Sequence, residues 1–345
     1  MSLPFNFSNG KKLRYGENPH QEGWFYAEES DDALAIQKFE MLQGKELSYN
    51  NYLDMDGALY ALSHLGGLKE DFSSFNPVSE GKPPMLNEVR QAVGGQKPAC
   101  VIVKHTNPCG AARKVTAEEA YQAAWYEGDP LAAFGGVMAI NREVGGALAE
   151  KMIENFFEIL LAPSVTEEAK AIFAKKPNLR VLLNPALLNP APPSGMHGHF
   201  IRGGILLESP DDKILFEKDL TIAASRQPSD EELRDLLFAW AICRSTKSNT
   251  IVAAKNETLI ASGAGQQDRK RCAELCVSKG GIRLKGAVSA SDAFFPFPDA
   301  LQVLISAGIT AVIQPGGSIK DAEVIAAANE AGIAMVMTGI RAFRH

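Results

Sequence analysis

The chain lacks a long apolar run, and it has few cysteines for its length of 345 residues. No hydrophobic segment approaches the roughly 20 residues that cross a bilayer, so no membrane association is expected. The first ten residues show no basic stretch followed by an apolar one, which argues against a signal peptide. The five cysteines are an odd, scattered set. They indicate reduced thiols and a cytoplasmic location rather than a disulfide framework.

The chain also lacks an excess of positive charge. Its 35 Lys and Arg residues face 41 Asp and Glu residues, which gives a formal net charge of −6. A general nucleic-acid binder would show a basic patch or stripe, so no nucleic-acid partner is expected. An anionic small molecule would have to be attracted by local Lys and Arg side chains. The composition is otherwise that of a globular protein, and the length is sufficient for two domains.

Helical and strand patterns alternate along the chain, which is typical of an α/β fold. Thr116 with Glu119, and Ser229 with Glu232, are capping boxes that open predicted helices. A helix–strand–helix–strand series over 116–162 is echoed over 298–337. The echo predicts two related α/β subdomains, each with a mixed sheet covered by helices.

Two segments rich in proline and glycine interrupt this alternation. Residues 69–98 predict a long irregular insertion with a short helix near 86–93. Residues 177–198 contain several prolines, and we place a domain boundary at their end. The expected domains are therefore 1–198, which carries the Lys-His pair described next, and 199–345.

The most informative stretch is VIVKHTNPCG, residues 101–110. Its first three residues predict a buried strand. Neighbouring strand residues point to opposite faces, so Lys104 and His105 can share a site only if the strand ends there. Pro108 predicts that ending, because it lacks an N–H and disfavours helix before it. The pair suits a reaction that develops negative charge and moves a proton, although it also fits a solvated strand end.

Three further segments each allow two interpretations. The glycine-rich turn 263–269 fits an anion cradle at a helix start or an ordinary connection. The aromatic run 294–297 is broken by a proline, which suits a stacking platform for a flat heterocycle as well as core packing. The terminal residues 341–345 follow an apolar strand pattern, so they are expected to be tethered to the sheet rather than frayed.

Together these segments resemble the aminoimidazole carboxamide ribonucleotide (AICAR) formyltransferase domain of the bifunctional PurH family. The matching motifs are LRYGENPHQ, LSYNNYLDMDGAL, VKHTNPCG, DPLAAFGG, KSNTIV, GAGQ, SDAFFPF, PGGS and RxFRH, in family order from residue 13 to 345. The resemblance implies two cytidine-deaminase-like subdomains and a homodimer with shared active sites. The family's IMP cyclohydrolase domain has no counterpart among these motifs, which implies a separate cyclohydrolase chain.

The resemblance also implies a reaction: formyl transfer from N10-formyltetrahydrofolate, as co-substrate, to the 5-amino group of AICAR. His105 would remove the amine proton, Lys104 would stabilise the oxyanion or deliver a proton, and Asn249 would orient the reacting groups. The implied substrate-binding residues are Arg14, Tyr15, Gly135, Glu158, Arg269, Phe294, Arg341, Phe343 and His345. The implied folate-binding residues are Phe134, Phe294 and Pro296. A monovalent cation such as potassium would lie near Ser248, Thr250 and Asp292.

Two alternatives belong to other classes of protein. A zinc deaminase needs His-x-Glu and Pro-Cys-x-x-Cys. Here Asn107 stands where that glutamate would be, and Pro108-Cys109 is followed by Gly-Ala-Ala, so no zinc is expected. A non-catalytic purine-nucleotide-binding regulator would not need to retain the candidate catalytic residues. One departure is Asp268, which stands where the family usually has a small hydroxyl residue and is expected to weaken anion binding.

Overall fold

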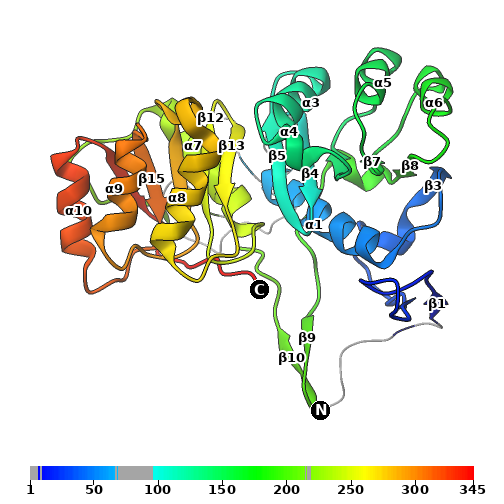
Figure 1. Ribbon diagram of the computed structural model, residues 1–345, viewed down its shortest axis with the longest axis horizontal. Helices are drawn as coiled ribbons and strands as arrows, with labels where there is room; N and C mark the ends of the chain where they lie inside the picture. Colours follow the sequence, from blue (N-terminus) through cyan, green and yellow to red (C-terminus); the bar gives the residue numbers. More distant parts are fainter. Residues whose placement is uncertain (1–6, 8–9, 67, 69–95, 214, 216–218) are drawn as a thin grey trace, which may run out of the picture.

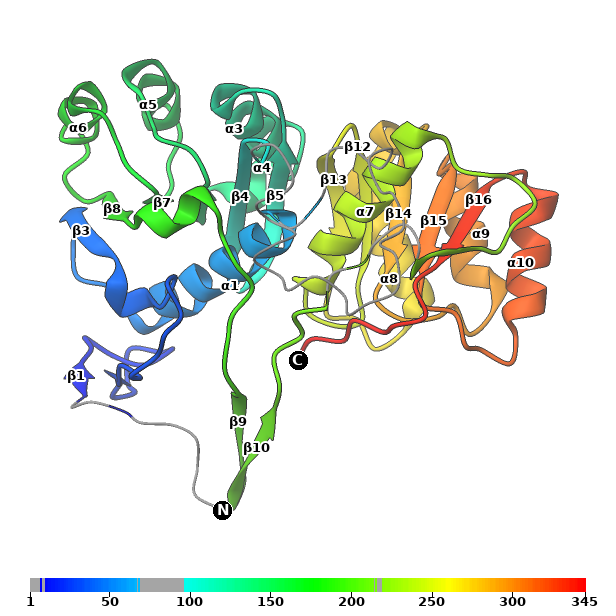
Figure 2. The same ribbon diagram turned by 180° about the vertical axis from the view of Figure 1, so that it is seen from behind.

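The computed structural model describes residues 7, 10–66, 68, 96–213, 215 and 219–345. The centre of the fold is a 12-stranded mixed sheet with helices on both faces, which Figures 1 and 2 show from opposite sides. This architecture confirms the predicted α/β class. Among the described residues, no helix combines the length and apolar character needed to cross a membrane.

The first half of the sheet has a hairpin at its inner end and parallel strands beyond it. Its elements are β3 (Glu40–Gln43), α1 (Tyr49–Gly66), β4 (Ala99–Lys104), β5 (Asn107–Arg113), α3 (Ala117–Tyr126), α4 (Pro130–Ala133), β6 (Val137–Ile140), α5 (Gly146–Ile153), β7 (Ile159–Ala162), α6 (Glu167–Phe173) and β8 (Arg180–Leu183). Strand β4 pairs antiparallel with β5 and β6, β6 to β8 run parallel, and β3 closes the edge antiparallel to β8.

The second half repeats this plan. Its elements are β11 (Thr221–Ile222), α7 (Asp230–Arg244), β12 (Ile251–Lys255), β13 (Thr258–Gly263), α8 (Arg269–Gly280), β14 (Val288–Ser291), α9 (Pro298–Ser306), β15 (Ala311–Gln314), α10 (Asp321–Glu330) and β16 (Ala334–Met337). Strand β12 pairs antiparallel with β13 and β14, β14 to β16 run parallel, and β11 closes the edge. Both predicted capping boxes are present, at the starts of α3 and α7.

The predicted internal repeat is confirmed, but its register was wrong by one helix–strand unit. Strand pairing matches α5, β7, α6 and β8 with α9, β15, α10 and β16. The sequence echo had instead matched the unit beginning at α3 with the one beginning at α9. The shift arose because the VSAS sequence of β14 is too small and polar to show a strand pattern, so the unit that ends in this strand was missed.

The two half-sheets join edge to edge. Strands β5 and β13 pair antiparallel through Ala112 and Thr258, so the strand order is β11-β16-β15-β14-β12-β13-β5-β4-β6-β7-β8-β3. On one face, α1 and α7 share a single hydrophobic cluster that crosses the seam and includes Leu62, Val101 and Phe238. On the other face, each half has its own cluster, under α3 to α6 or under α8 to α10. The shared layer fixes the two halves against each other.

Two small sheets lie outside the main one. Strands β1 (Lys11–Lys12) and β2 (Trp24–Phe25) form one, and the hairpin of β9 (His197–Ile201) and β10 (Gly204–Glu208) projects from the body in both views. Residue 198, the predicted boundary, falls in β9, and the division into two domains stays a prediction. Most of the predicted insertion, with its helix near 86–93, lies outside the described residues.

Candidate active site

Strand β4 ends at Lys104, as predicted, but the turn that follows is not the predicted one. His105 and Thr106 form a two-residue turn that pairs Lys104 with Asn107. Both turn residues are left-handed, with φ of 52° and 62°. Pro108 lies inside β5, opposite Val103, where the register shifts. The expectation that Pro108 ends the strand was therefore wrong: the chain reverses before it, and the missing N–H falls at an irregular position of the ladder.

Three contacts hold this turn in place. Asp54 reaches from α1, and its Oδ1 accepts a hydrogen bond from Thr106 N at 2.7 Å. On the other side, Asn107 Nδ2 donates to His105 O at 2.9 Å. Gly57 lets the helix approach, because a Cβ there would lie 3.3 Å from Thr106 O. Residues other than glycine adopt this left-handed conformation at a cost in free energy. The contacts of Asp54 and Asn107 hold the turn in it from both sides.

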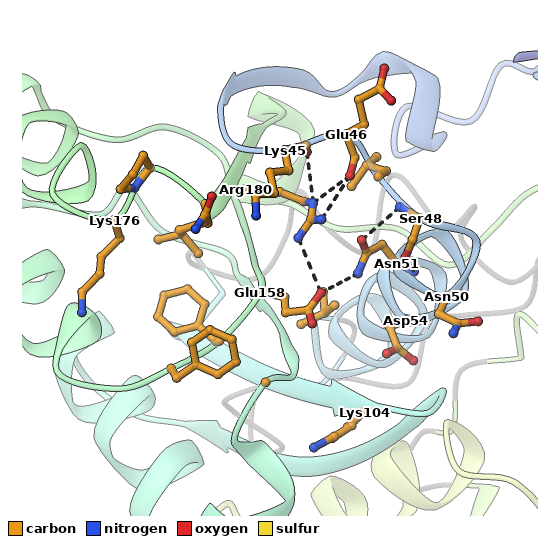
Figure 3. A pocket seen from close by; sticks show the side chains of 18 of the residues that line it. Lys45, Glu46, Ser48, Asn50, Asn51, Asp54, Lys104, Glu158, Lys176 and Arg180 are labelled. Atoms are coloured by element: carbon orange, nitrogen blue, oxygen red, sulfur yellow. Dashed lines mark hydrogen bonds and ion pairs between the residues drawn. The ribbon is translucent and has the colours of Figure 1, made fainter. Parts of the chain in front are cut away.

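A cleft of about 970 Å³ opens beside the turn, at the amino ends of β6, β7 and β8 (Figure 3). It brings together the predicted residues of the first half except Phe134, which does not line it. The cleft is lined by Arg14, Tyr15, Lys104, His105, Gly135 and Glu158, together with residues that the sequence did not single out. A second, smaller cavity also borders Lys104 and His105 and extends toward β13. The Lys-His pair therefore lies at the junction of two hollows.

Cations line the cleft despite the acidic balance of the chain. Lys104 Nζ donates to Phe134 O at 2.7 Å, which places its charge beside Gly135. Glu158 accepts from Asn51 Nδ2 at 3.0 Å and pairs with Arg180 at 3.5 Å (Figure 3). Burial lowers the pKa of Arg180, Glu158 raises it, and the charge of Arg14 lowers it further. The local positive charge that an anionic ligand needs is present here.

An aromatic pair stands next to Lys104. The rings of Phe134 and Phe156 lie 5.0 Å apart at a tilted angle. Both are more than half exposed, at 59% and 54%. Large apolar rings left in solvent next to a polar cleft offer a surface on which a flat heterocycle can stack.

The second half holds a buried polar cluster around Asn249. Arg269 donates to Asn249 Oδ1 at 2.8 Å and pairs with Asp292 Oδ1 at 2.5 Å. Arg269 is 7% exposed and Asp292 is fully buried. The guanidinium therefore orients Asn249 and compensates a buried carboxylate, and its use as a substrate ligand stays a prediction. Asp268 has an ordinary structural explanation, since its side chain caps α8 by accepting from Arg271 N at 2.8 Å.

The C-terminal residues are tethered to this cluster, as predicted. Ala342 N donates to Asp292 O at 2.9 Å, and Ser248 exchanges two hydrogen bonds with the backbone of Arg344, at 2.9 and 3.0 Å. The guanidinium of Arg341 lies 4.4 Å from the centre of the Phe343 ring, which in turn is 5.9 Å from His345. The chain end thus lies at the junction of the two halves (Figures 1 and 2).

Lys247 connects the two groups of predicted residues. Its backbone N–H donates to Asn107 Oδ1 at 2.9 Å, and its Nζ donates to the carbonyl of His345. Burial and the charge of Arg344 lower the Lys247 pKa. The turn, the KSN segment and the chain end therefore touch. Phe294 (40% exposed) and the half-buried Pro296 do not line the 970 Å³ cleft.

Comparison with known proteins identifies the family of this chain. The model of the AICARFT/IMPCHase bienzyme family matches residues 1–80 and 83–279. The chain is also 41% identical, over its whole length, to the bifunctional purine biosynthesis protein PurH of Polynucleobacter asymbioticus, of which it spans 60%. The chain belongs to the AICARFT/IMPCHase family.

Several residues of the cleft were missed in the sequence, among them Asn51, Asp54, Phe156 and Arg180. Asp54 and Asn51 lie in the LSYNNYLDMDGAL motif, so a signal was present but no role was assigned to them. Arg180 and Phe156 carry no local signal. Arg180 reaches Glu158 only because β7 and β8 are neighbours in the sheet.

Proposed function

We propose that this chain transfers a formyl group from N10-formyltetrahydrofolate to the 5-amino group of AICAR, giving formyl-AICAR and tetrahydrofolate, within purine biosynthesis. One observation carries the proposal. Lys104 and His105 stand side by side on a held turn, where they border the cation-lined cleft. Membership in the AICARFT/IMPCHase family supports it.

The residues divide the chemistry as follows. An aromatic amine is a weak nucleophile, so His105 removes its proton as it attacks the formyl carbon. The attack produces an oxyanion and a leaving nitrogen that needs a proton. Lys104, held near Gly135 through Phe134 O, supplies the positive charge for the oxyanion or the proton for the leaving nitrogen. Asn249, fixed by Arg269, orients the formyl group or the histidine.

The arrangement does not favour a non-catalytic regulator. A binding protein has no need to set a lysine and a histidine side by side at the rim of the cleft. The left-handed backbone of the turn does not separate the two interpretations, because the equivalent turn of the second half shares it. The carboxylate of Asp54 and the amide of Asn107 are both used to maintain this turn.

The cofactor and partner proposals rest on the second cluster. Asp292 Oδ2 is buried without a hydrogen-bond partner among the described residues, which suits a monovalent cation such as potassium near Ser248 and Thr250. The cation would satisfy the second oxygen of the carboxylate, since Arg269 already pairs with the first. The exposed Phe294 lies away from the cleft, and we propose a homodimer whose active sites draw on both chains. We also propose a cytoplasmic location.

The nucleotide phosphate gives a test of the binding residues. Arg14 lines the cleft, and Arg341 belongs to the chain end joined to the turn through Lys247. A planar guanidinium binds phosphate in a bidentate manner that lysine does not reproduce. Arg14→Lys and Arg341→Lys are therefore each expected to raise KM for AICAR clearly more than KM for the folate in steady-state assays. A folate-selective defect would move that arginine to the other part of the site.

The reaction itself is tested by mixing purified protein with AICAR and N10-formyltetrahydrofolate and following tetrahydrofolate formation by absorbance. Tetrahydrofolate is expected only when AICAR is present. AICAR-independent release would indicate a hydrolase instead. If AICAR binds but no turnover occurs, the result would favour the non-catalytic regulator over the enzyme.

A further inference from the structure

The internal repeat places an aspartate beneath the hairpin turn in each half. Asp54 is the sixth residue of α1, and Asp235 is the sixth residue of α7. Asp54 Oδ1 accepts from Thr106 N at 2.7 Å. Asp235 accepts from Asn256 N at 2.8 Å and from Glu257 N at 2.6 Å. The same device therefore holds the turn of β4–β5 and the turn of β12–β13.

Both turns have the same unusual backbone. Asn256 and Glu257 have φ of 53° and 50°, close to the values at His105 and Thr106. Two-residue hairpins of this hand require φ above zero at both positions. Glycine and asparagine adopt that conformation most readily, whereas a β-branched residue resists it. Thr106 is thus the least suited of the four residues to its position.

The second turn has supports that the first does not share. Glu257 pairs with Arg113 at 2.7 Å and with Lys97 at 3.0 Å, and Lys114 Nζ donates to Asn256 O at 2.5 Å. These side chains line a groove beside the second turn. The first turn instead borders the cleft that the substrate is proposed to enter. The turn that carries His105 must stay open, so more of its support falls to Asp54.

We propose that Asp54 is the positioning residue of the catalytic turn: its carboxylate fixes the backbone of Thr106 and so aims His105 into the cleft. This inference rests on the proposed function. Burial raises the pKa of the Asp54 carboxyl, and the hydrogen bonds from Thr106 and His105 oppose that shift. The hydrogen bonds from the turn are therefore the main interactions that offset the burial of this carboxylate.

The first test compares matched variants in the two halves. Asp54→Ala is expected to lower kcat by about 10²-fold with KM for AICAR changed less than about threefold, because a misplaced catalytic group loses rate rather than binding. Asp54→Asn keeps an oxygen acceptor, so its loss should be smaller. Asp235→Ala removes the equivalent carboxylate from the other turn and is expected to keep kcat within about twofold. Equal losses of kcat at both positions would overturn the proposal.

A rescue separates positioning from any other role of the carboxylate. Glycine adopts φ above zero without a Cβ clash. Thr106→Gly in the Asp54→Ala background should therefore raise kcat by about tenfold, because a glycine turn adopts the left-handed conformation without the Asp54 hydrogen bond. No gain in the double variant would show that Asp54 acts on the reaction in another way, and would overturn the proposal.

Amide hydrogen exchange tests the turn without any assay of turnover. The Thr106 amide is expected to be protected in the wild-type protein and to lose protection in Asp54→Ala, while the Asn256 amide stays protected. If this pattern appears in a protein that transfers no formyl group, the proposed function fails and the role of Asp54 in holding the turn stands. Unchanged protection at Thr106 would overturn the inference, whatever the activity.

Discussion

His105→Ala is expected to lower kcat for formyl transfer by about 10²-fold or more, the effect of losing a general base. Lys104→Ala is expected to do the same through lost stabilisation of the oxyanion. His105 is exposed, and Lys104 bonds only a backbone carbonyl among the contacts found in the described residues. Neither truncation opens a core cavity, so both variants should keep the wild-type fold and melting temperature.

Stopped-flow or steady-state kinetics with tetrahydrofolate detection measures this effect, and circular dichroism checks the fold. A matched control is Lys114→Ala, which removes a lysine that bonds the backbone of the equivalent turn in the other half. That control should retain nearly full turnover. If both His105→Ala and Lys104→Ala keep near-wild-type kcat, the assignment of the reaction to this turn is wrong.

Arg269→Ala is expected to be the most destabilising of these substitutions. It would leave the fully buried Asp292 carboxylate without its cation, and breaking a buried pair in this way costs about 3–5 kcal/mol. It would also release Asn249 Oδ1, so kcat should fall in whatever fraction still folds. Urea denaturation measures the change in the free energy of unfolding.

Lys170→Ala provides the comparison. Lys170 pairs with Glu167 at 2.6 Å on an exposed face of α6, where an ion pair is worth less than about 1 kcal/mol. Arg269→Lys keeps the charge but not the planar guanidinium. Its loss of unfolding free energy should therefore lie between those of Arg269→Ala and Lys170→Ala. A loss below about 1 kcal/mol for Arg269→Ala would mean that the cluster is not a structural unit.

Local features of the fold could be predicted where the residues of one short segment determine its structure. The β-branched run at 101–103 forms a strand because its side chains suit burial on both faces, and β4 is indeed buried along five of its six residues. Thr116 and Ser229 cap their helices because the bonds close within one turn. Such signals need no knowledge of the rest of the chain.

The turn at His105 and Thr106 could not be predicted in the same way. Its conformation depends on Asp54 from a preceding helix and on the close approach that Gly57 permits. Without those contacts, a His-Thr dipeptide has no preference for φ above zero, and Pro108 was the stronger local signal. The position of the turn was therefore misjudged, although the role of Lys104 as the last strand residue was not.

The candidate site likewise contains residues that could be predicted from the sequence and residues whose place depends on packing. The family resemblance implied one site for Arg14, Lys104 and Glu158, and the cleft brings them together. Motifs alone could not show that Arg269 faces Asp292 rather than solvent, since burial follows from how α8 packs on β12 and β13. Arg180 shows the opposite case, a charge that enters the cleft through strand order alone.

The central claim is that the formyl carbon is transferred to AICAR at the Lys104–His105 turn. Its most direct measurement follows a ¹³C-labelled formyl group of the folate by NMR, in the wild-type protein and in His105→Ala. The account predicts that the label moves to the 5-amino nitrogen of AICAR with the wild-type protein, and about 10²-fold more slowly with the variant. Label that remains on the folate, is released as formate, or moves equally fast with both proteins would contradict the account.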